Sequence, residues 1–164
     1  MARNAVLDAQ EVLEAYWADT NGDVVFPVDP VKIATLMDAD VFVDALPLGV
    51  SGCITKRADM RAEIILSEDN GPQRQRFTCA HEIGHLYSRR ADRQFEYKDY
   101  RDGRAADGVD SEEIYANRFA AALLMPAKFV RQFHEMGLPV SHLARRFGVS
   151  VPAIEYRLKN LGLA

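Results

Sequence analysis

A chain of 164 residues is long enough to form one domain with a substantial hydrophobic core and without disulfides. Hydrophobic residues make up 48% of the chain and charged residues 27%, which are the proportions of a soluble globular protein. The formal net charge of -4 excludes a polycation that binds nucleic acid along its whole length, although a local basic patch is compatible with it. No apolar run reaches the roughly 20 residues of a membrane-spanning helix, so we expect no membrane partner.

The N-terminal segment is polar and leads into an amphipathic pattern, which is unlike a secretory signal. The two cysteines, Cys53 and Cys79, lie far apart in the sequence. We therefore expect a reduced, cytoplasmic protein. Apolar residues at helical spacing predict a first helix over residues 4–18, and Asp29 followed by Pro30 predicts the start of a second.

Three short apolar segments follow, and turn residues separate them. They cover residues 41–46, 50–55 and 62–66. Because the connections are short, we expect an antiparallel meander, whose edge strand could accept an extended peptide as an additional strand. A purely structural sheet fits the same pattern equally well.

The stretch RFTCAHEIGHLYS, residues 76–88, contains a His-Glu-x-x-His motif at His81, Glu82 and His85. On a helix with about 100° per residue, the two histidines lie about 40° apart, so both imidazoles can reach one cation. Glu82 lies about a quarter turn to the side, where its carboxylate can contact the attacking water without binding the metal.

A chance match on an ordinary buried helix is the alternative, because short patterns recur by accident. A third ligand downstream favours the metal site over this alternative. Cys79 lies about 200° around the helix from His81 and should face away from a metal, which favours a structural thiol over a redox sensor.

Residues 89–110 have mixed charge and include Phe95, Tyr97 and Tyr100 without a clear period. They connect the two halves of the predicted site, so they could form one wall of a cleft or a lid. A solvated loop is an equally good interpretation.

Residues 111–124 predict a strong helix, with Ser111 as a candidate cap. Glu113 is the expected third protein ligand of the metal. Asn117 follows at i+4 on the same face, where it can hydrogen-bond a ligand imidazole. Glu112 is the competing ligand. Without the histidine motif, Glu113 and Asn117 would be interpreted only as part of an acidic first turn and a polar helix face.

The tail predicts a helix over residues 127–136, and then a helix, a glycine-bearing turn and a helix that resemble a helix-turn-helix. Residues 150–157 would be the recognition helix. The residues that could contact phosphate are Arg145, Arg146, Arg157 and Lys159. Apolar positions in the last helix and an acidic Glu155 in its middle favour a packed or partner-binding hairpin over DNA binding.

Two neutral histidines and one carboxylate leave an open coordination position, which is the arrangement of a hydrolytic zinc site. Manganese can occupy similar sites. Glu82 would accept the proton of the water and pass it to the leaving amine. The candidates for stabilising the oxyanion or contacting the substrate are Tyr87, Tyr97, Tyr100, Tyr115 and His134.

The segments RFTCAHEIGH and EEIYANRFAAALLMP together resemble the ImmA/IrrE family of metallo-endopeptidases, and the resemblance extends from about Ile64 to the C-terminus. It implies a thermolysin-like α+β core, a cytoplasmic setting in bacteria, phages or mobile elements, and a protein substrate. In characterised relatives the substrate is a helix-turn-helix repressor, whose cleavage releases transcription. By motif position, the resemblance implies His81, His85 and Glu113 as ligands and Glu82 as the base.

We therefore expect an α+β fold with a short antiparallel sheet. Residues 1–138 would form a small thermolysin-like metallopeptidase core, and residues 139–164 a helix-turn-helix-like hairpin within the same domain. The expected function is that of a zinc-dependent endopeptidase that cleaves a repressor or antitoxin encoded nearby. The alternative is a regulator with the peptidase fold that binds a repressor, an antitoxin or DNA without cleavage.

Overall fold

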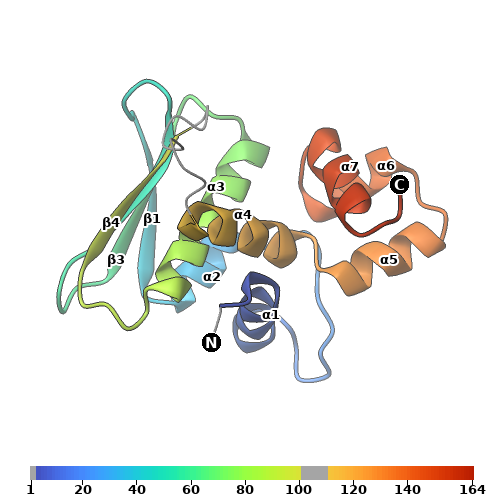
Figure 1. Cartoon of the computed structure of the whole chain (residues 1–164), viewed down its shortest axis with the longest axis horizontal. Helices are drawn as coiled ribbons and strands as arrows, with labels where there is room; N and C mark the ends of the chain where they lie inside the picture. The colour runs from blue at the N-terminus through green and yellow to red at the C-terminus, as the bar shows by residue number, and fades with distance from the viewer. Residues whose placement is uncertain (1–2, 101–110) are drawn as a thin grey trace.

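The computed structural model describes residues 3–100 and 111–164, apart from the side chains of residues 99 and 100, and shows an α+β fold (Figure 1). The elements are α1 (Ala5–Tyr16), α2 (Pro30–Leu36), β1 (Ala39–Asp44), β2 (Val50–Lys56), β3 (Ala62–Ser67), α3 (Pro72–Ser88), β4 (Phe95–Tyr100), α4 (Ser111–Leu124), α5 (Ala127–Glu135), α6 (Val140–Phe147) and α7 (Val151–Asn160). No helix of the described residues has both the length and the apolar composition of a membrane span.

The first two helices begin at the residues that the sequence predicts as caps. The Asn4 side chain accepts hydrogen bonds from the first-turn amides of α1. The Asp29 side chain does the same for α2, whose first residue is Pro30. Both caps satisfy amides that have no partner within the helix, which is why the two helices begin there. The predicted helices are thus confirmed within one or two residues.

The sheet has the strand order β1-β3-β2-β4 and is mixed. Strand β1 pairs with β3 in parallel, whereas β2 pairs with β3 and with β4 in antiparallel fashion. The predicted antiparallel meander is therefore wrong. Neighbouring strands lie about 4.8 Å apart, so residues 45–49 can span the two strand spacings that separate β1 from β2. Strand β3 lies between β1 and β2, so the short connection between these two strands does not make them neighbours in the sheet.

Strand β4 was not predicted as a strand. It pairs with β2 in a register that places Phe95 opposite Lys56 and Tyr97 opposite Ile54. Its sequence alternates aromatic and charged residues over Phe95–Lys98, which is the period of a half-buried strand. Part of the segment predicted as a cleft wall or loop is thus the edge of the sheet, and residues 101–110 lie outside the described residues.

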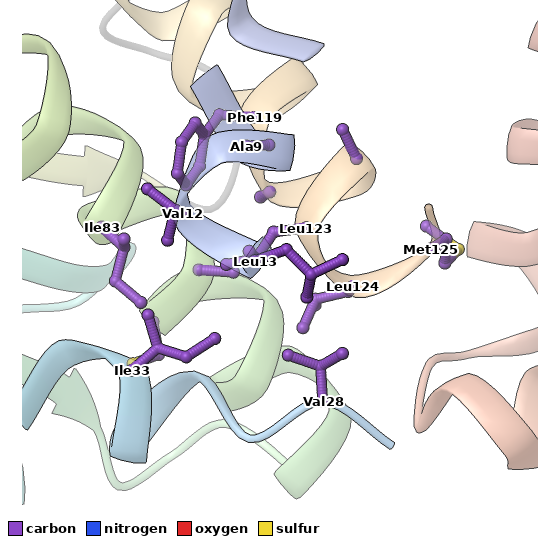
Figure 2. Close-up of a cluster of buried hydrophobic side chains, with 14 of the residues drawn as sticks. Ala9, Val12, Leu13, Val28, Ile33, Ile83, Phe119, Leu123, Leu124 and Met125 are labelled. Atoms are coloured by element: carbon purple, nitrogen blue, oxygen red, sulfur yellow. The ribbon is translucent and has the colours of Figure 1, made fainter. Parts of the chain in front are cut away.

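Helix α3 packs against the sheet, and α4 crosses α3 on the side away from it (Figure 1). Gly84 allows this crossing, because a Cβ there would lie 3.1 Å from the Cα of Ala116 and 3.2 Å from the Cβ of Phe119. The close crossing brings the second half of α3 near the first turn of α4. Figure 2 shows apolar side chains of the surrounding core, including Val12, Leu13, Ile33, Ile83, Phe119 and Leu123.

Helices α5, α6 and α7 lie on the far side of α4 from the sheet (Figure 1). Gly148 ends α6 with φ +66, a left-handed conformation that suits glycine. Arg76 of α3 holds this turn, since it donates hydrogen bonds to the carbonyl of Gly148 (3.0 Å) and to that of Val28 (2.6 Å). The buried Arg157 of α7 donates to the carbonyl of Met125 (3.0 Å). Two arginines therefore fasten the C-terminal helices to the rest of the chain.

Candidate metal centre

The histidines of the His-Glu-x-x-His motif meet on one face of α3. His81 and His85 are each 1% exposed, and their Nε2 atoms lie 3.1 Å apart. Their ring planes are inclined by 72°, so both Nε2 atoms converge while the rings do not stack. This arrangement is the one that the i, i+4 spacing predicts for two ligands of one ion.

Glu113, on the first turn of α4, faces both imidazoles. Its Oε2 lies 3.2 Å from Nε2 of His81, and its Oε1 lies 3.1 Å from Nε2 of His85. The three side chains offer two nitrogens and one oxygen within 4.8 Å of one another. Two imidazoles and one carboxylate form a donor set that suits zinc and leaves a coordination position for water or substrate.

Asn117 fixes the orientation of the His81 ring. Its Oδ1 lies 3.0 Å from Nδ1 of His81. Because an amide oxygen only accepts, this contact favours a proton on Nδ1 of His81, which leaves Nε2 as the nitrogen available to a metal. A hydrogen bond of this kind selects the tautomer that binds a metal and increases the basicity of the ligand.

The surroundings of Glu113 keep its carboxylate charged. Burial by itself raises the pKa of Glu113, but the hydrogen bonds and charges of His81 and His85 outweigh burial and lower the pKa to about 2. A charged carboxylate against two imidazoles has the electrostatic character that a bound divalent cation requires.

Glu112, the competing ligand of the sequence analysis, faces a different set of groups. Its Oε2 accepts a hydrogen bond from Ser88 (3.3 Å), and its Oε1 lies 3.7 Å from Arg89 and 3.8 Å from Arg3. The geometry therefore favours Glu113 for the metal and assigns Glu112 to ion pairs at the end of α3.

Glu82 is completely buried on the side of α3 that faces β2. Gly52 of β2 makes room for it. A Cβ at Gly52 would lie 3.5 Å from Oε1 of Glu82 and 2.5 Å from Cγ2 of Thr78. The carboxylate thus lies between the motif helix and β2, offset around α3 from the two imidazoles by the angle that helical spacing predicts.

Tyr97 of β4 is the candidate aromatic residue that contacts the histidine cluster. Its ring stacks on that of His85, with centroids 4.2 Å apart and planes 7° from parallel. Its hydroxyl is hydrogen-bonded to Arg89, whose guanidinium also lies over the ring. Because β4 was not predicted, the sequence could not distinguish Tyr97 from the other tyrosines.

The remaining candidates for oxyanion or substrate contacts are placed elsewhere. The hydroxyl of Tyr87 donates to Glu11 (2.5 Å) and that of the buried Tyr115 donates to Asp8 (2.6 Å), so both tyrosines connect to α1. The hydrogen bond to Glu11 raises the pKa of Tyr87, and burial together with the hydrogen bond to Asp8 raises the pKa of Tyr115. His134 is half-buried on α5, beyond α4 (Figure 1), and the side chain of Tyr100 lies outside the described residues.

Both cysteines are free thiols. Cys79 is completely buried, and burial strongly raises its pKa. Cys53 is half-buried, and burial raises its pKa as well. A buried thiol with a raised pKa is a poor nucleophile, so the structure favours a packing role for Cys79.

The basic residues of the C-terminal helices differ in their access to solvent. Arg157 is 8% exposed and bonded to a backbone carbonyl, so it does not present a free guanidinium to phosphate. Arg146 lies over the ring of Phe133 at 4.2 Å. Arg145 and Lys159 are exposed. Arg157 is therefore removed from the residues that could contact phosphate, because its side chain holds α7 against the end of α4.

The profile of peptidase family M78, described as the IrrE N-terminal-like domain, matches residues 37–159. The chain is 36% identical over 100 residues to the radiation response metalloprotease IrrE of Deinococcus deserti, and 35% identical over 100 residues to that of Deinococcus radiodurans. Each match covers 58% of this chain, but only 35% and 30% of the respective relative. The chain thus spans about a third of the length of these relatives.

A solved structure described as a Mycobacterium tuberculosis transcriptional regulator shares the fold, with a TM-score of 0.62 at 19% identity. The superposition covers 94% of this chain and 46% of that protein. The likeness therefore includes nearly all elements of the fold described above.

Proposed function

The chain belongs to peptidase family M78, the IrrE N-terminal-like domain family, and on this premise we propose that it is a zinc-dependent endopeptidase. The membership confirms the resemblance to the ImmA/IrrE family. The observation that carries the proposal is the convergence of His81, His85 and Glu113, with both Nε2 atoms 3.1–3.2 Å from one carboxylate.

His81, His85 and Glu113 would hold the metal, and Asn117 would orient His81 for it. We propose zinc, because two imidazoles and one carboxylate are a common donor set for hydrolytic zinc, although manganese can occupy such sites. A bound zinc ion supplies a Lewis acid that polarises the scissile carbonyl and increases the acidity of water.

Glu82 would act as the general base. Its buried carboxylate would accept the proton of the attacking water and then give this proton to the nitrogen of the leaving amine. The rigid position of Glu82 between α3 and β2 would hold the carboxylate at the site during both transfers. Tyr97 would keep the ring of His85 in its orientation through the stacking contact.

We propose that the substrate is a protein, and specifically a helix-turn-helix repressor or antitoxin encoded near this chain, in a cytoplasmic setting. Strand β4 lies at one edge of the described sheet and pairs there with β2. An extended substrate segment could add to this edge as a further strand, with backbone hydrogen bonds that do not depend on sequence.

Incubation of the purified chain with each neighbouring repressor tests the proposal. Zinc-loaded wild type should cut one of them at a single site, as detected by intact-mass analysis, and Glu82→Gln should bind zinc but leave the repressor intact. Absence of zinc binding by the wild type would overturn the proposal. Cleavage that persists in Glu82→Gln would remove Glu82 from its role as base.

A non-cleaving regulator that binds DNA or a repressor is the second candidate. The exposed Arg145 and Lys159 on α6 and α7 favour it, as residues 139–164 would then act as a helix-turn-helix within the same domain. DNA binding should survive chelation and weaken steeply with salt, whereas the peptidase should lose activity on chelation. Loss of DNA affinity in Arg145→Ala would support this candidate.

A further inference from the structure

A pocket of about 440 Å³ lies between α4 and α7, next to the candidate metal centre. Its lining includes Phe77 of α3, Asn117 and Ala121 of α4, and Ala153 and Tyr156 of α7. We call it the α7 pocket. Asn117 belongs to both sites, since its side chain bonds His81 while it also lines the pocket.

The α7 pocket continues the row of residues that forms the metal centre. On α3, Phe77 precedes His81 by four residues and therefore lies on the same face, one turn of about 5.4 Å away. On α4, Ala121 follows Asn117 by four residues in the same way. The pocket thus begins one helical turn from His81 along α3 and extends one helical turn from Asn117 along α4.

Helix α7 forms the outer wall of the pocket and is firmly held. Pro152, Ala153 and Tyr156 supply this wall. Arg157 anchors the middle of α7 to the carbonyl of Met125, and Arg76 anchors the turn before α7 to α3. A wall that is fastened at two points can discriminate between side chains by shape, because its position is fixed before a ligand binds.

The surface of the α7 pocket selects an apolar group. Its area is mostly apolar, with Phe77, Ala121, Met125, Ala153 and the ring of Tyr156. The polar side-chain groups are the amides of Asn117 and Asn160, the guanidinium of Arg157 and the hydroxyl of Tyr156, and the described lining includes no carboxylate that would attract a cation. A second cavity of about 360 Å³ shares Phe77 and Ala153 with the α7 pocket and lies further toward the first turn of α3.

We propose that the α7 pocket receives an apolar side chain of the substrate next to the cleaved bond, so that the last helix sets the specificity of the peptidase. This inference rests on the proposed function, because the metal centre defines where the bond is cut. Its occupant is a leucine-like side chain of an extended protein segment. A segment bound there covers Pro152, Ala153 and Tyr156, which lie in the stretch that a recognition helix would present to DNA.

Two zinc-binding probes test the pocket without the need for a natural substrate. One is an unsubstituted succinyl hydroxamate, and the other carries an isobutyl side chain beside the chelating group. Titration calorimetry on zinc-loaded wild type should show about tenfold to hundredfold tighter binding of the isobutyl probe, which is the factor expected for burying a leucine-like side chain. Acetohydroxamate, which has no side chain to place, measures access to the metal alone.

Substitutions that fill the pocket should abolish the preference. Ala153→Phe fills it from α7 and Ala121→Phe from α4, so either variant should bind the two succinyl probes with similar affinity. Glu155→Phe places the same side chain on an exposed position of α7 outside the pocket and should keep the preference. Two filling variants on different helices guard against a folding defect in one of them.

The outcomes separate the pocket from the peptidase. If wild type binds neither zinc nor acetohydroxamate, the proposed function fails and the pocket proposal fails with it. If wild type binds both but does not distinguish the succinyl probes, the pocket proposal alone is overturned. A preference that survives both filling variants would also overturn it, because the isobutyl group would then lie elsewhere, for example along β4.

Discussion

The side-chain oxygen of Asn117 lies 3.0 Å from Nδ1 of His81 and connects α4 to α3 at the candidate metal centre. Without this acceptor the His81 ring is free to adopt the other tautomer, in which Nε2 carries a proton and binds no metal. We expect Asn117→Ala to lower zinc affinity by about 10- to 100-fold, as is typical for partners of metal-binding histidines. Competition with a zinc chelator of known affinity measures this change.

Asn117→Asp provides the matched test, because a carboxylate accepts the same hydrogen bond. This variant should bind zinc at least as tightly as wild type. Arg118→Ala, at the exposed next position of α4, should leave zinc affinity unchanged. Equal zinc affinity in Asn117→Ala and Arg118→Ala would show that Asn117 has no influence on the metal.

Glu113 and Glu112 are adjacent in sequence but face different groups. Glu113 faces both imidazoles, whereas Glu112 faces Ser88 and Arg89. We expect Glu113→Gln to reduce bound zinc to well below one ion per chain, because the carboxylate charge at the ligand position is lost. Glu112→Gln should retain about one ion. Elemental analysis of protein purified without a metal-affinity tag compares the two, and the reverse pattern would make Glu112 the ligand.

The local parts of this site could be predicted from the sequence. The positions of His81 and His85 follow from helical spacing alone, and those of Glu113 and Asn117 repeat the same spacing on a second helix. Caps such as Asn4 and Asp29 determine where helices begin through hydrogen bonds to amides two or three residues away. These features depend on few residues and short distances.

The parts that were not predicted depend on contacts between distant segments. Parallel pairing of β1 with β3 depends on which strands become neighbours, and no local pattern specifies that choice. Tyr97 follows His85 by twelve residues, and the two rings stack because β4 pairs with β2. No local pattern around the motif indicates this contact. The burial of Arg157 was not predicted either, because arginine side chains are mostly exposed to solvent.

Arg76 connects the motif helix to the C-terminal helices through its bonds to the carbonyls of Gly148 and Val28. Arg76→Met keeps most of the length of the side chain but removes these donors. Since hydrogen bonds from charged groups contribute about 1.5–3 kcal/mol, we expect the free energy of unfolding to fall by about that amount. Urea denaturation followed by circular dichroism measures it. Arg145→Met, which removes an exposed guanidinium, should change the stability by less than about 0.5 kcal/mol, and equal losses in the two variants would contradict the anchoring role.

Gly52 lies where β2 passes closest to the motif helix. A Cβ there would lie 2.5 Å from Cγ2 of Thr78 and 3.5 Å from Oε1 of Glu82. Gly52→Ala should therefore push α3 away from the sheet and lower the free energy of unfolding by about 1–3 kcal/mol, the usual cost of overpacking. Zinc affinity should change little, because the new Cβ meets Thr78 and Glu82 and none of the three ligand residues, whereas turnover should fall as Glu82 is displaced.

Thr78→Ser tests this account, because it removes the methyl group that the new Cβ would meet. Alone, Thr78→Ser should cost about 1 kcal/mol for the lost methyl group. In Gly52→Ala/Thr78→Ser, the total loss of stability should be smaller than the sum of the two single losses, because the variants share one contact. Denaturation of the four proteins gives this coupling energy, and cleavage of a repressor substrate shows whether turnover recovers with it. Strictly additive losses would mean that the two residues do not meet, and that Gly52 does not set the position of Glu82 through α3.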